Sequence, residues 1–192
     1  MKNFIEVFIF FSLILIFSFF NFSTSNYLIP VVLVFVLIRI FWLFSKNKIT
    51  VNADVLKNKK IYIGFFEYIF ILILSVIVLF LFKNEIKNLP PWLVDAESVW
   101  FTLFHTGAQE IIFRLYLLNR LKSILNNRLI ISIISGLSFG LVHFILPDAL
   151  FIVILTSIIG ILWSYVYLKK PNFILVWLSH FLLNIIIKFL AT

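Results

Sequence analysis

Long apolar runs alternate with short polar stretches along the whole chain. A helix needs about 20 apolar residues to cross the hydrocarbon core of a bilayer. The pattern predicts seven such helices, at roughly 4–22, 27–44, 61–82, 98–118, 129–146, 149–168 and 173–190. Asp148 and Asn172 precede the last two helices and are predicted to be their N-caps. The pattern therefore predicts an all-α polytopic membrane protein, a bundle of about seven transmembrane helices.

The composition supports a membrane protein. The 192 residues are 63% hydrophobic and 12% charged, and a soluble domain of this size cannot bury so much apolar surface. The absence of cysteine excludes disulfides, thiolate metal ligands and a cysteine nucleophile. We interpret the net charge of +8 as a signal of topology and expect no nucleic-acid partner.

Basic residues are concentrated in every second predicted loop. They are concentrated between the second and third helices, between the fourth and fifth, and between the sixth and seventh, and include Arg120, Lys122 and Arg128. The positive-inside rule then predicts a cytoplasmic N-terminus and an external C-terminus. Glu6, the length of the first apolar run and the lack of a small-residue cleavage site favour a membrane helix over a signal peptide.

Three predicted helices each carry a pair of residues four positions apart. The pairs are Glu110 with Arg114, Phe139 with His143, and His180 with Asn184. This spacing places both members of a pair on one face of a helix. An ionisable side chain at mid-bilayer depth costs roughly 2.5 kcal/mol or more, and it marks a functional site by default. Three such faces predict one buried polar site where three helices meet.

Each of these residues also has a structural interpretation. Glu110 and Arg114 can form an ion pair that only packs helices, or Arg114 can extend to the cytoplasmic surface. A lone membrane histidine is commonly an interhelical hydrogen-bond donor, and we expect a packing role for His105. Ser132, Gly136 and Gly140 form a stripe of small residues that predicts close approach of another helix.

The other intramembrane charges are expected to reach the interface. Arg39 and Lys188 lie within reach of it by extension of their side chains, and Glu67 is near enough to face the headgroups.

A carboxylate, two imidazoles and a carboxamide are the parts of an amide hydrolase. A carboxylate and a histidine can activate water, and a second histidine with an asparagine can stabilise an oxyanion. A zinc site with Glu110, His143 and His180 as ligands is the competing use of these groups. The His-Glu-x-x-His helix of zinc proteases is absent, so we expect no metal or other cofactor.

With these motifs the chain resembles the CPBP family of intramembrane proteases, the CAAX-protease and bacteriocin-processing group that is also called Abi. The family's motifs are Glu-Glu-x-x-x-Arg, Phe-x-x-x-His and His-x-x-x-Asn or His-x-x-x-Asp, on separate helices in that order. They correspond here to Gln109–Arg114, Phe139–His143 and His180–Asn184. The resemblance covers roughly 95–190, and it divides the chain into an N-terminal segment, 1–94, with three helices and a core, 95–192, with four. Composition and family together indicate a bacterial source.

The resemblance implies a role for each motif residue. The first Glu of the opening motif and His143 would activate water, His180 and Asn184 would form the oxyanion hole, and Glu110 would pair with Arg114. Early family members were called metalloproteases, and the later picture is a metal-independent glutamate protease. The implied substrate is a peptide or a membrane-anchored protein, within or at the lipid bilayer.

The chain departs from the family at Gln109, because an amide cannot act as a general base. Three explanations stay open: Glu110 takes the base role, the protein is an inactive relative that binds a partner, or the glutamine was introduced to trap an inactive enzyme. The leading hypothesis is an intramembrane endopeptidase. The alternative is a catalytically inactive membrane adaptor or bacteriocin-immunity-type protein. A small proton-coupled transporter is the third, disfavoured by the lack of internal repeats.

Overall fold

The described part of the chain is all-helical. The structure, a computed structural model, describes residues 5–7, 9, 12, 38, 64–84, 99–143 and 150–191. Its elements are α4 (Phe65–Leu81), α7 (Val99–Glu110), η2 (Ile111–Leu117), α8 (Leu118–Lys122), α9 (Arg128–Leu141), α10 (Leu150–Lys169) and α11 (Phe173–Ala191). The predicted all-α fold class is thus confirmed for these residues. The predicted helices at 4–22 and 27–44 and the predicted cap Asp148 lie almost entirely outside them.

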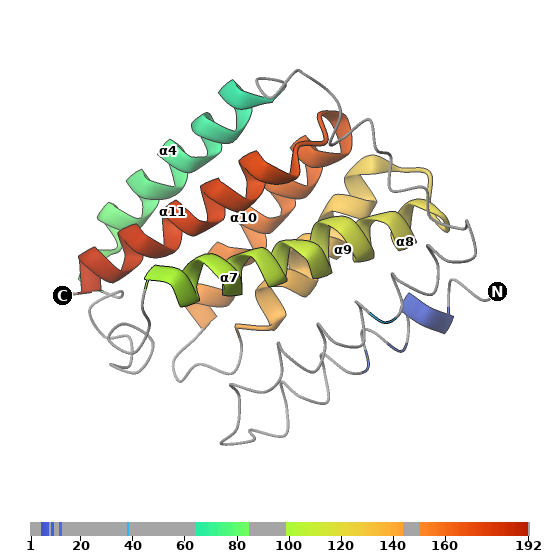
Figure 1. The fold of residues 1–192 in the computed structure, drawn as a ribbon, viewed down its shortest axis with the longest axis horizontal. Helices are drawn as coiled ribbons and strands as arrows, with labels where there is room; N and C mark the ends of the chain where they lie inside the picture. The colour runs from blue at the N-terminus through green and yellow to red at the C-terminus, as the bar shows by residue number, and fades with distance from the viewer. Residues whose placement is uncertain are drawn as a thin grey trace.

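The helices pack around α11 and around the pair formed by α9 and α10. Figure 1 shows α11 running between α4 and α7, with α10 and α9 behind them, and α11 contacts both of its neighbours. Trp177 on α11 donates from Nε1 to the Leu103 carbonyl oxygen on α7 at 2.9 Å. Gly107 lies against this indole, since a Cβ there would come within 3.1 Å of the Trp177 ring. A small residue on α7 therefore makes room for a large one on α11.

Two of the described helices are long and apolar enough to cross a membrane. They are Leu150–Lys169, which is α10, and Phe173–Leu190, which is nearly all of α11. α4 and α9 are apolar but shorter, with 17 and 14 residues. The five predicted helices from 61–82 onwards each correspond to a helix or a run of helices, whereas the crossing of the membrane by seven helices stays a prediction.

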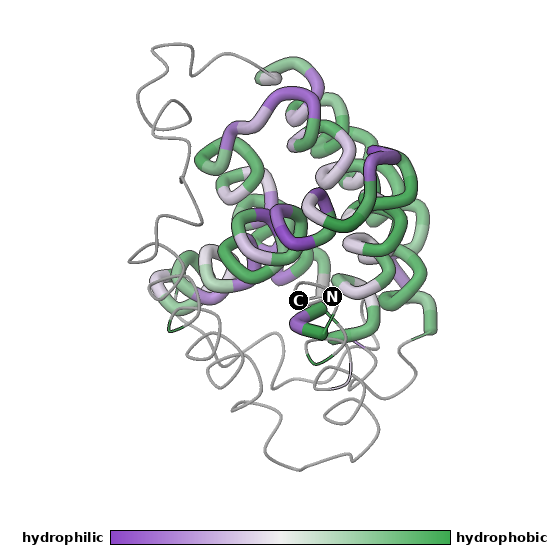
Figure 2. The backbone as a smooth tube through the Cα atoms, turned by 90° about the vertical axis from the view of Figure 1, so that its right-hand side faces the viewer, coloured by the Kyte–Doolittle hydropathy of each residue, from purple (hydrophilic) through white to green (hydrophobic). Residues whose placement is uncertain are grey.

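Apolar side chains cover the outside of the described helices, and the interior combines an apolar core with buried polar side chains. Phe66 is 82% exposed and Phe189 is 77% exposed, whereas Glu110, Arg114 and Ser164 are fully buried. Figure 2 shows long hydrophobic stretches of helix interrupted by short hydrophilic ones. A water-soluble protein rarely exposes so many large apolar side chains, and it rarely buries charged side chains completely. The apolar exterior and the two long apolar helices indicate a membrane protein.

The small-residue stripe of α9 packs directly on α10. A Cβ built on Gly136 would overlap the backbone of Ile161, and one on Gly140 would overlap the Ser157 hydroxyl and the Val153 carbonyl oxygen. The predicted close approach of another helix is therefore confirmed. The two helices also share a buried hydrogen bond, which Ser164 Oγ donates to Ser135 Oγ at 3.2 Å.

Several polar residues outside the motifs join segments that are distant in sequence. Arg120, expected in a loop, lies in α8, because the helical run continues beyond residue 118, and its Nε is 3.2 Å from Glu6 Oε2. Lys170 pairs with Glu67, which was expected to face the headgroups. Lys188 donates from Nζ to Thr102 Oγ1 at 3.0 Å, an interhelical bond that the sequence did not predict.

The predicted cap of the last helix is confirmed. Asn172 Oδ1 accepts a hydrogen bond from the Leu175 backbone N–H at 3.1 Å. This bond satisfies one of the backbone donors that the first turn of a helix leaves without an intrahelical acceptor.

Candidate functional site

The helix that carries the first motif changes its winding at Glu110. The α-helical turns of α7 end at this residue, and η2 continues as a π-helix. The Leu118 backbone N–H donates to the Phe113 carbonyl, five residues back, at the end of this wider segment. π-Turns inside helices are rare and frequently lie at functional sites. Arg114 therefore projects from a wider turn than an ideal α-helix would provide.

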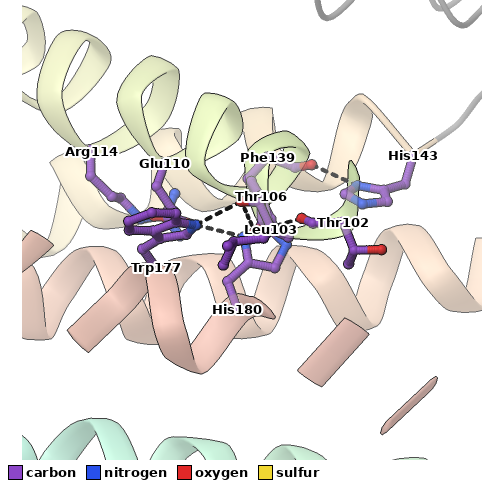
Figure 3. Close-up of polar contacts among 9 residues, drawn as sticks. All are labelled: Thr102, Leu103, Thr106, Glu110, Arg114, Phe139, His143, Trp177 and His180. Atoms are coloured by element: carbon purple, nitrogen blue, oxygen red, sulfur yellow. Dashed lines mark hydrogen bonds and ion pairs between the residues drawn. The ribbon is translucent and has the colours of Figure 1, made fainter. Parts of the chain in front are cut away.

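Glu110 is held at both of its carboxylate oxygens. Its Oε2 is 3.1 Å from Arg114 Nε, and its Oε1 is 2.8 Å from His180 Nδ1 (Figure 3). Glu110 and Arg114 are fully buried and His180 is 3% exposed. The predicted Glu110–Arg114 ion pair is confirmed as a contact, and extension of Arg114 to the surface is wrong. The structure thus brings a residue of the third motif against the first.

Aromatic rings hold the two histidines of the later motifs. The Phe139 ring centroid is 5.3 Å from those of His143 and His180, and Arg114 Cζ lies 5.1 Å from the Phe139 centroid. Trp163 on α10, which is fully buried, packs on His180 with its ring centroid at 5.3 Å. Phe139 therefore separates the histidines while contacting both.

Trp163 is the residue of this cluster that sequence reasoning missed. Its helix has no charged residue before Lys169 in its last turn, and a tryptophan in an apolar run is typical of any buried helix. No signal in the chain itself points to it.

The spacing of Phe139 and His143 brings the His143 ring to the backbone carbonyl of Phe139. His143 follows the end of α9, and its Nδ1 lies 2.9 Å from the Phe139 carbonyl oxygen (Figure 3). A carbonyl oxygen only accepts hydrogen bonds, so Nδ1 carries the proton in this contact. The Nε2 of a neutral His143 then has a free lone pair, which can accept a proton or a hydrogen bond.

The two carboxamides of the motifs differ in their surroundings. Gln109 is 4% exposed, and its Oε1 has no hydrogen-bond partner within the described residues. Buried polar atoms are nearly always satisfied in native proteins, so such an atom is typical of a place where water or a ligand binds. Asn184 is partly buried one turn after His180 on α11. Gln109 directly precedes Glu110 in the sequence, and Asn184 follows His180 by four residues.

The described residues do not form a metal site. Within the ranges that the structure describes, no three His, Cys, Asp or Glu side chains are placed to hold one ion. Both Glu110 oxygens are already engaged, one with Arg114 and the other with His180. Glu110, His143 and His180 therefore do not fit the zinc ligand set that the sequence left open.

The fold and this cluster define a helical membrane protein with a carboxylate–histidine contact in its interior. Comparison with protein families matches residues 91–186, half of the chain, to the family described as Type II CAAX prenyl endopeptidase Rce1-like. The chain belongs to this family, as the resemblance of its three motifs predicted, and all three motifs lie in the matched segment. Comparison with curated proteins and with solved structures gives no match.

Proposed function

We propose that this protein is an intramembrane peptidase of the CAAX-protease type, which hydrolyses a peptide bond in a peptide or membrane-associated substrate with an activated water. The observation that carries the proposal is the buried contact of Glu110 with His180 at 2.8 Å. A charged or ionisable pair is costly inside an apolar bundle, and such residues are characteristically functional. Membership of a peptidase family supports the same reaction.

The arrangement favours histidine over Glu110 as the group that takes a proton from water. Arg114 and His180 engage both oxygens of the Glu110 carboxylate. A carboxylate held in this way orients its partners and balances their charge. Gln109 cannot take the proton, but its carboxamide can hold a water molecule or an oxyanion because it both donates and accepts hydrogen bonds.

The proposal includes a complete membrane arrangement. Seven transmembrane helices put the two ends on opposite sides of the membrane, and the positive-inside rule puts the N-terminus in the cytoplasm and the C-terminus outside. Residues 1–94 form an N-terminal helical segment, and 95–192 form the core that carries the site. His143, His180, Asn184, Gln109 and Glu110 are its proposed site residues, with Arg114 pairing Glu110. The substrate reaches them from the bilayer or its surface.

The test is cleavage by the purified protein in lipid vesicles, measured by mass spectrometry on a library of membrane-associated peptides. We expect the wild-type protein to cleave, and His143→Ala and His180→Ala to lose about 100-fold or more of the activity, the typical contribution of proton-transfer groups. His105→Ala is the matched control, since His105 stacks on Phe101 and belongs to no motif. Equal activity of the three variants would contradict the assignment. Loss of activity with a chelator would restore a metal mechanism.

Gln109→Glu tests the departure from the family pattern. The added carboxylate supplies a second proton acceptor beside Glu110, so we expect activity to rise about tenfold or more, within the range of general-base contributions. The same vesicle assay measures it.

A non-catalytic adaptor or immunity-type protein is the second candidate function, and Gln109 is the observation that favours it. In that case only the Gln109→Glu variant cleaves peptides, and His143→Ala leaves the biological function of the wild-type protein intact. Cleavage by the unmodified protein excludes this candidate.

A further inference from the structure

We propose that Lys188, in the last turn of α11, binds the C-terminal carboxylate of the substrate. The inference rests on the proposed peptidase reaction and deepens it, because it names a chemical group that the substrate must carry. The sequence alone predicted only that this lysine extends to the membrane surface.

Two polar contacts fix the register of α7 against α11. Glu110 Oε1 lies 2.8 Å from His180 Nδ1. Thr102 Oγ1 accepts a hydrogen bond from Lys188 Nζ at 3.0 Å. The two contacts are eight residues apart on each helix, so one antiparallel register satisfies both, and Figure 1 shows the beginning of α7 beside the C-terminal end of α11. Lys188 therefore lies on the side of α11 that faces α7, as His180 does.

The positions between these two contacts are also polar. Thr106 on α7 and Asn184 on α11 are midway, four residues from the contact on either side. Thr106 is fully buried, and Asn184 is partly buried. Polar residues therefore occupy every fourth position of both helices from the contact of Glu110 with His180 to the contact at Lys188.

The ammonium group of Lys188 is turned toward this interface. A lysine near a helix end ordinarily extends to the polar surface of the membrane, but Lys188 is hydrogen-bonded to Thr102, which is only 2% exposed. The Thr102 hydroxyl carries no charge, so it orients the ammonium without neutralising it. A charged side chain held among membrane helices marks a functional site by default. An ammonium group prefers an anionic oxygen, which a carboxylate or a phosphate supplies.

The distance from the candidate site favours a peptide carboxylate. Eight residues of α-helix rise about 12 Å, and an extended peptide advances about 3.3 Å per residue. About three or four residues of substrate therefore cover the length from a bond held at His180 to Lys188. The one anion that a peptide carries at a fixed place regardless of its side chains is the carboxylate at its C-terminus. Lys188 is thus a specificity-determining residue, and it takes no part in the chemical step.

Binding without turnover tests the inference separately from the peptidase reaction. The probe is acetylated tetraleucine with a free C-terminal carboxylate, compared with the same peptide as its C-terminal amide. Calorimetry on the full chain in dodecyl maltoside, a detergent without phosphate, measures the two Kd values. We expect the carboxylate form to bind about 10-fold to 100-fold more tightly, the usual range for a hydrogen bond to a charged group. Equal Kd values, or no binding of either form at millimolar concentration, overturn the inference.

The variants connect this preference to one side chain. Lys188→Gln should remove the difference between the two forms, and Lys188→Arg should keep it because the charge remains. Glutamine can still donate to Thr102, and the unfolding temperature of each variant checks the fold. Lys169→Gln is the matched control, since Lys169 is an exposed lysine in the last turn of α10, and it should leave both Kd values unchanged. A preference that survives in Lys188→Gln overturns the assignment.

A lipid phosphate is the other source of a suitable anion. Phosphatidylglycerol added to the detergent solution distinguishes the two sources. If Lys188→Gln lowers the amount of phosphatidylglycerol that copurifies with the protein and leaves the carboxylate preference unchanged, the ligand is a lipid headgroup and the inference is overturned.

The vesicle cleavage assay supplies the kinetic arm. Amidation of a cleaved peptide should raise the KM of the wild-type protein about 10-fold to 100-fold with little change in kcat, because the carboxylate contributes binding that is equal in ground and transition states. Lys188→Gln should cleave both forms alike. Wild-type cleavage that ignores amidation overturns the inference and leaves the proposed function intact. Carboxylate-dependent binding through Lys188 without cleavage of any peptide would contradict the proposed function instead.

Discussion

At the scale of single residues, the central feature is a carboxylate that two cationic or potentially cationic groups share inside the bundle. None of the three Arg114 guanidinium nitrogens has a hydrogen-bond partner within the described part of the chain. The ion pair with Glu110 and the face of Phe139 at 5.1 Å therefore compensate its charge. An apolar pair of similar volume would give the same packing without a desolvation cost. The pair is therefore better explained by the contact it makes with His180 than by stability.

Arg114→Gln should destabilise the protein. The change leaves the buried Glu110 carboxylate without its charge partner, which typically costs about 3 to 5 kcal/mol. Thermal unfolding of the detergent-purified variant, followed by circular dichroism, measures the effect. The double variant Glu110→Gln, Arg114→Gln is the matched control, because it removes both charges, and it should regain most of the lost stability. Equal losses in the single and double variants would show that the two charges are not coupled.

At the scale of elements, the contact of α9 with α10 sets the positions of Phe139 and Trp163. Both residues touch His180, and they come from two helices whose backbones approach closely at Gly136 and Gly140. Close approach of this kind is the usual way in which membrane helices associate, since lipid provides no hydrophobic driving force between them. The packing of these two helices thus controls the geometry of the site.

Gly140→Ala should weaken this contact. The added methyl group would overlap Ser157 and the Val153 carbonyl oxygen, and overpacking of a tight interface typically costs about 1 to 3 kcal/mol. A lower unfolding temperature in detergent is the expected result. Leu137→Ala on the same helix is the control: its side chain is 49% exposed, so its effect should stay within about 0.5 kcal/mol. An unfolding temperature equal to that of the wild type would show that α10 adjusts without cost.

At the scale of the whole molecule, the distribution of basic residues predicts which loops face the cytoplasm. The chain contains no cysteine, so a single introduced cysteine can be labelled without background. Asn84 lies at the end of the α4 segment and Asn126 lies between α8 and α9, and both are exposed. These positions are on opposite sides of the membrane in the proposed topology.

Asn84→Cys in intact cells should react with a membrane-impermeant maleimide, and Asn126→Cys should react only after permeabilisation. The reason is the positive-inside rule, which places the connection between α8 and α9, with Arg120, Lys122 and Arg128 at its ends, in the cytoplasm. Ile77→Cys is the control, since Ile77 is 52% exposed on the apolar face of α4 and should not react with a polar reagent in the bilayer. The opposite labelling pattern would invert the topology.

Much of the fold could be predicted because the bilayer allows few alternatives. A segment in hydrocarbon must satisfy its backbone hydrogen bonds internally, so long apolar runs become helices, as α10 and α11 illustrate. The ends were less predictable: the helical run from Val99 continues to Lys122, beyond the end that was predicted at residue 118. The π-helical turn around Arg114 had no sequence signature, because it depends on how the helix fits its neighbours.

The sequence by itself determined which side chains share a face of one helix. Glu110 and Arg114 meet because residues four apart are neighbours on a helix, and His143 reaches the Phe139 carbonyl by the same spacing. Only the tertiary structure decided which faces meet one another. Glu110 and His180 are 70 residues apart, and Trp163 packs on His180 from a helix with no motif. Contacts between helices follow from side-chain packing over several elements at once, and no local spacing encodes that packing.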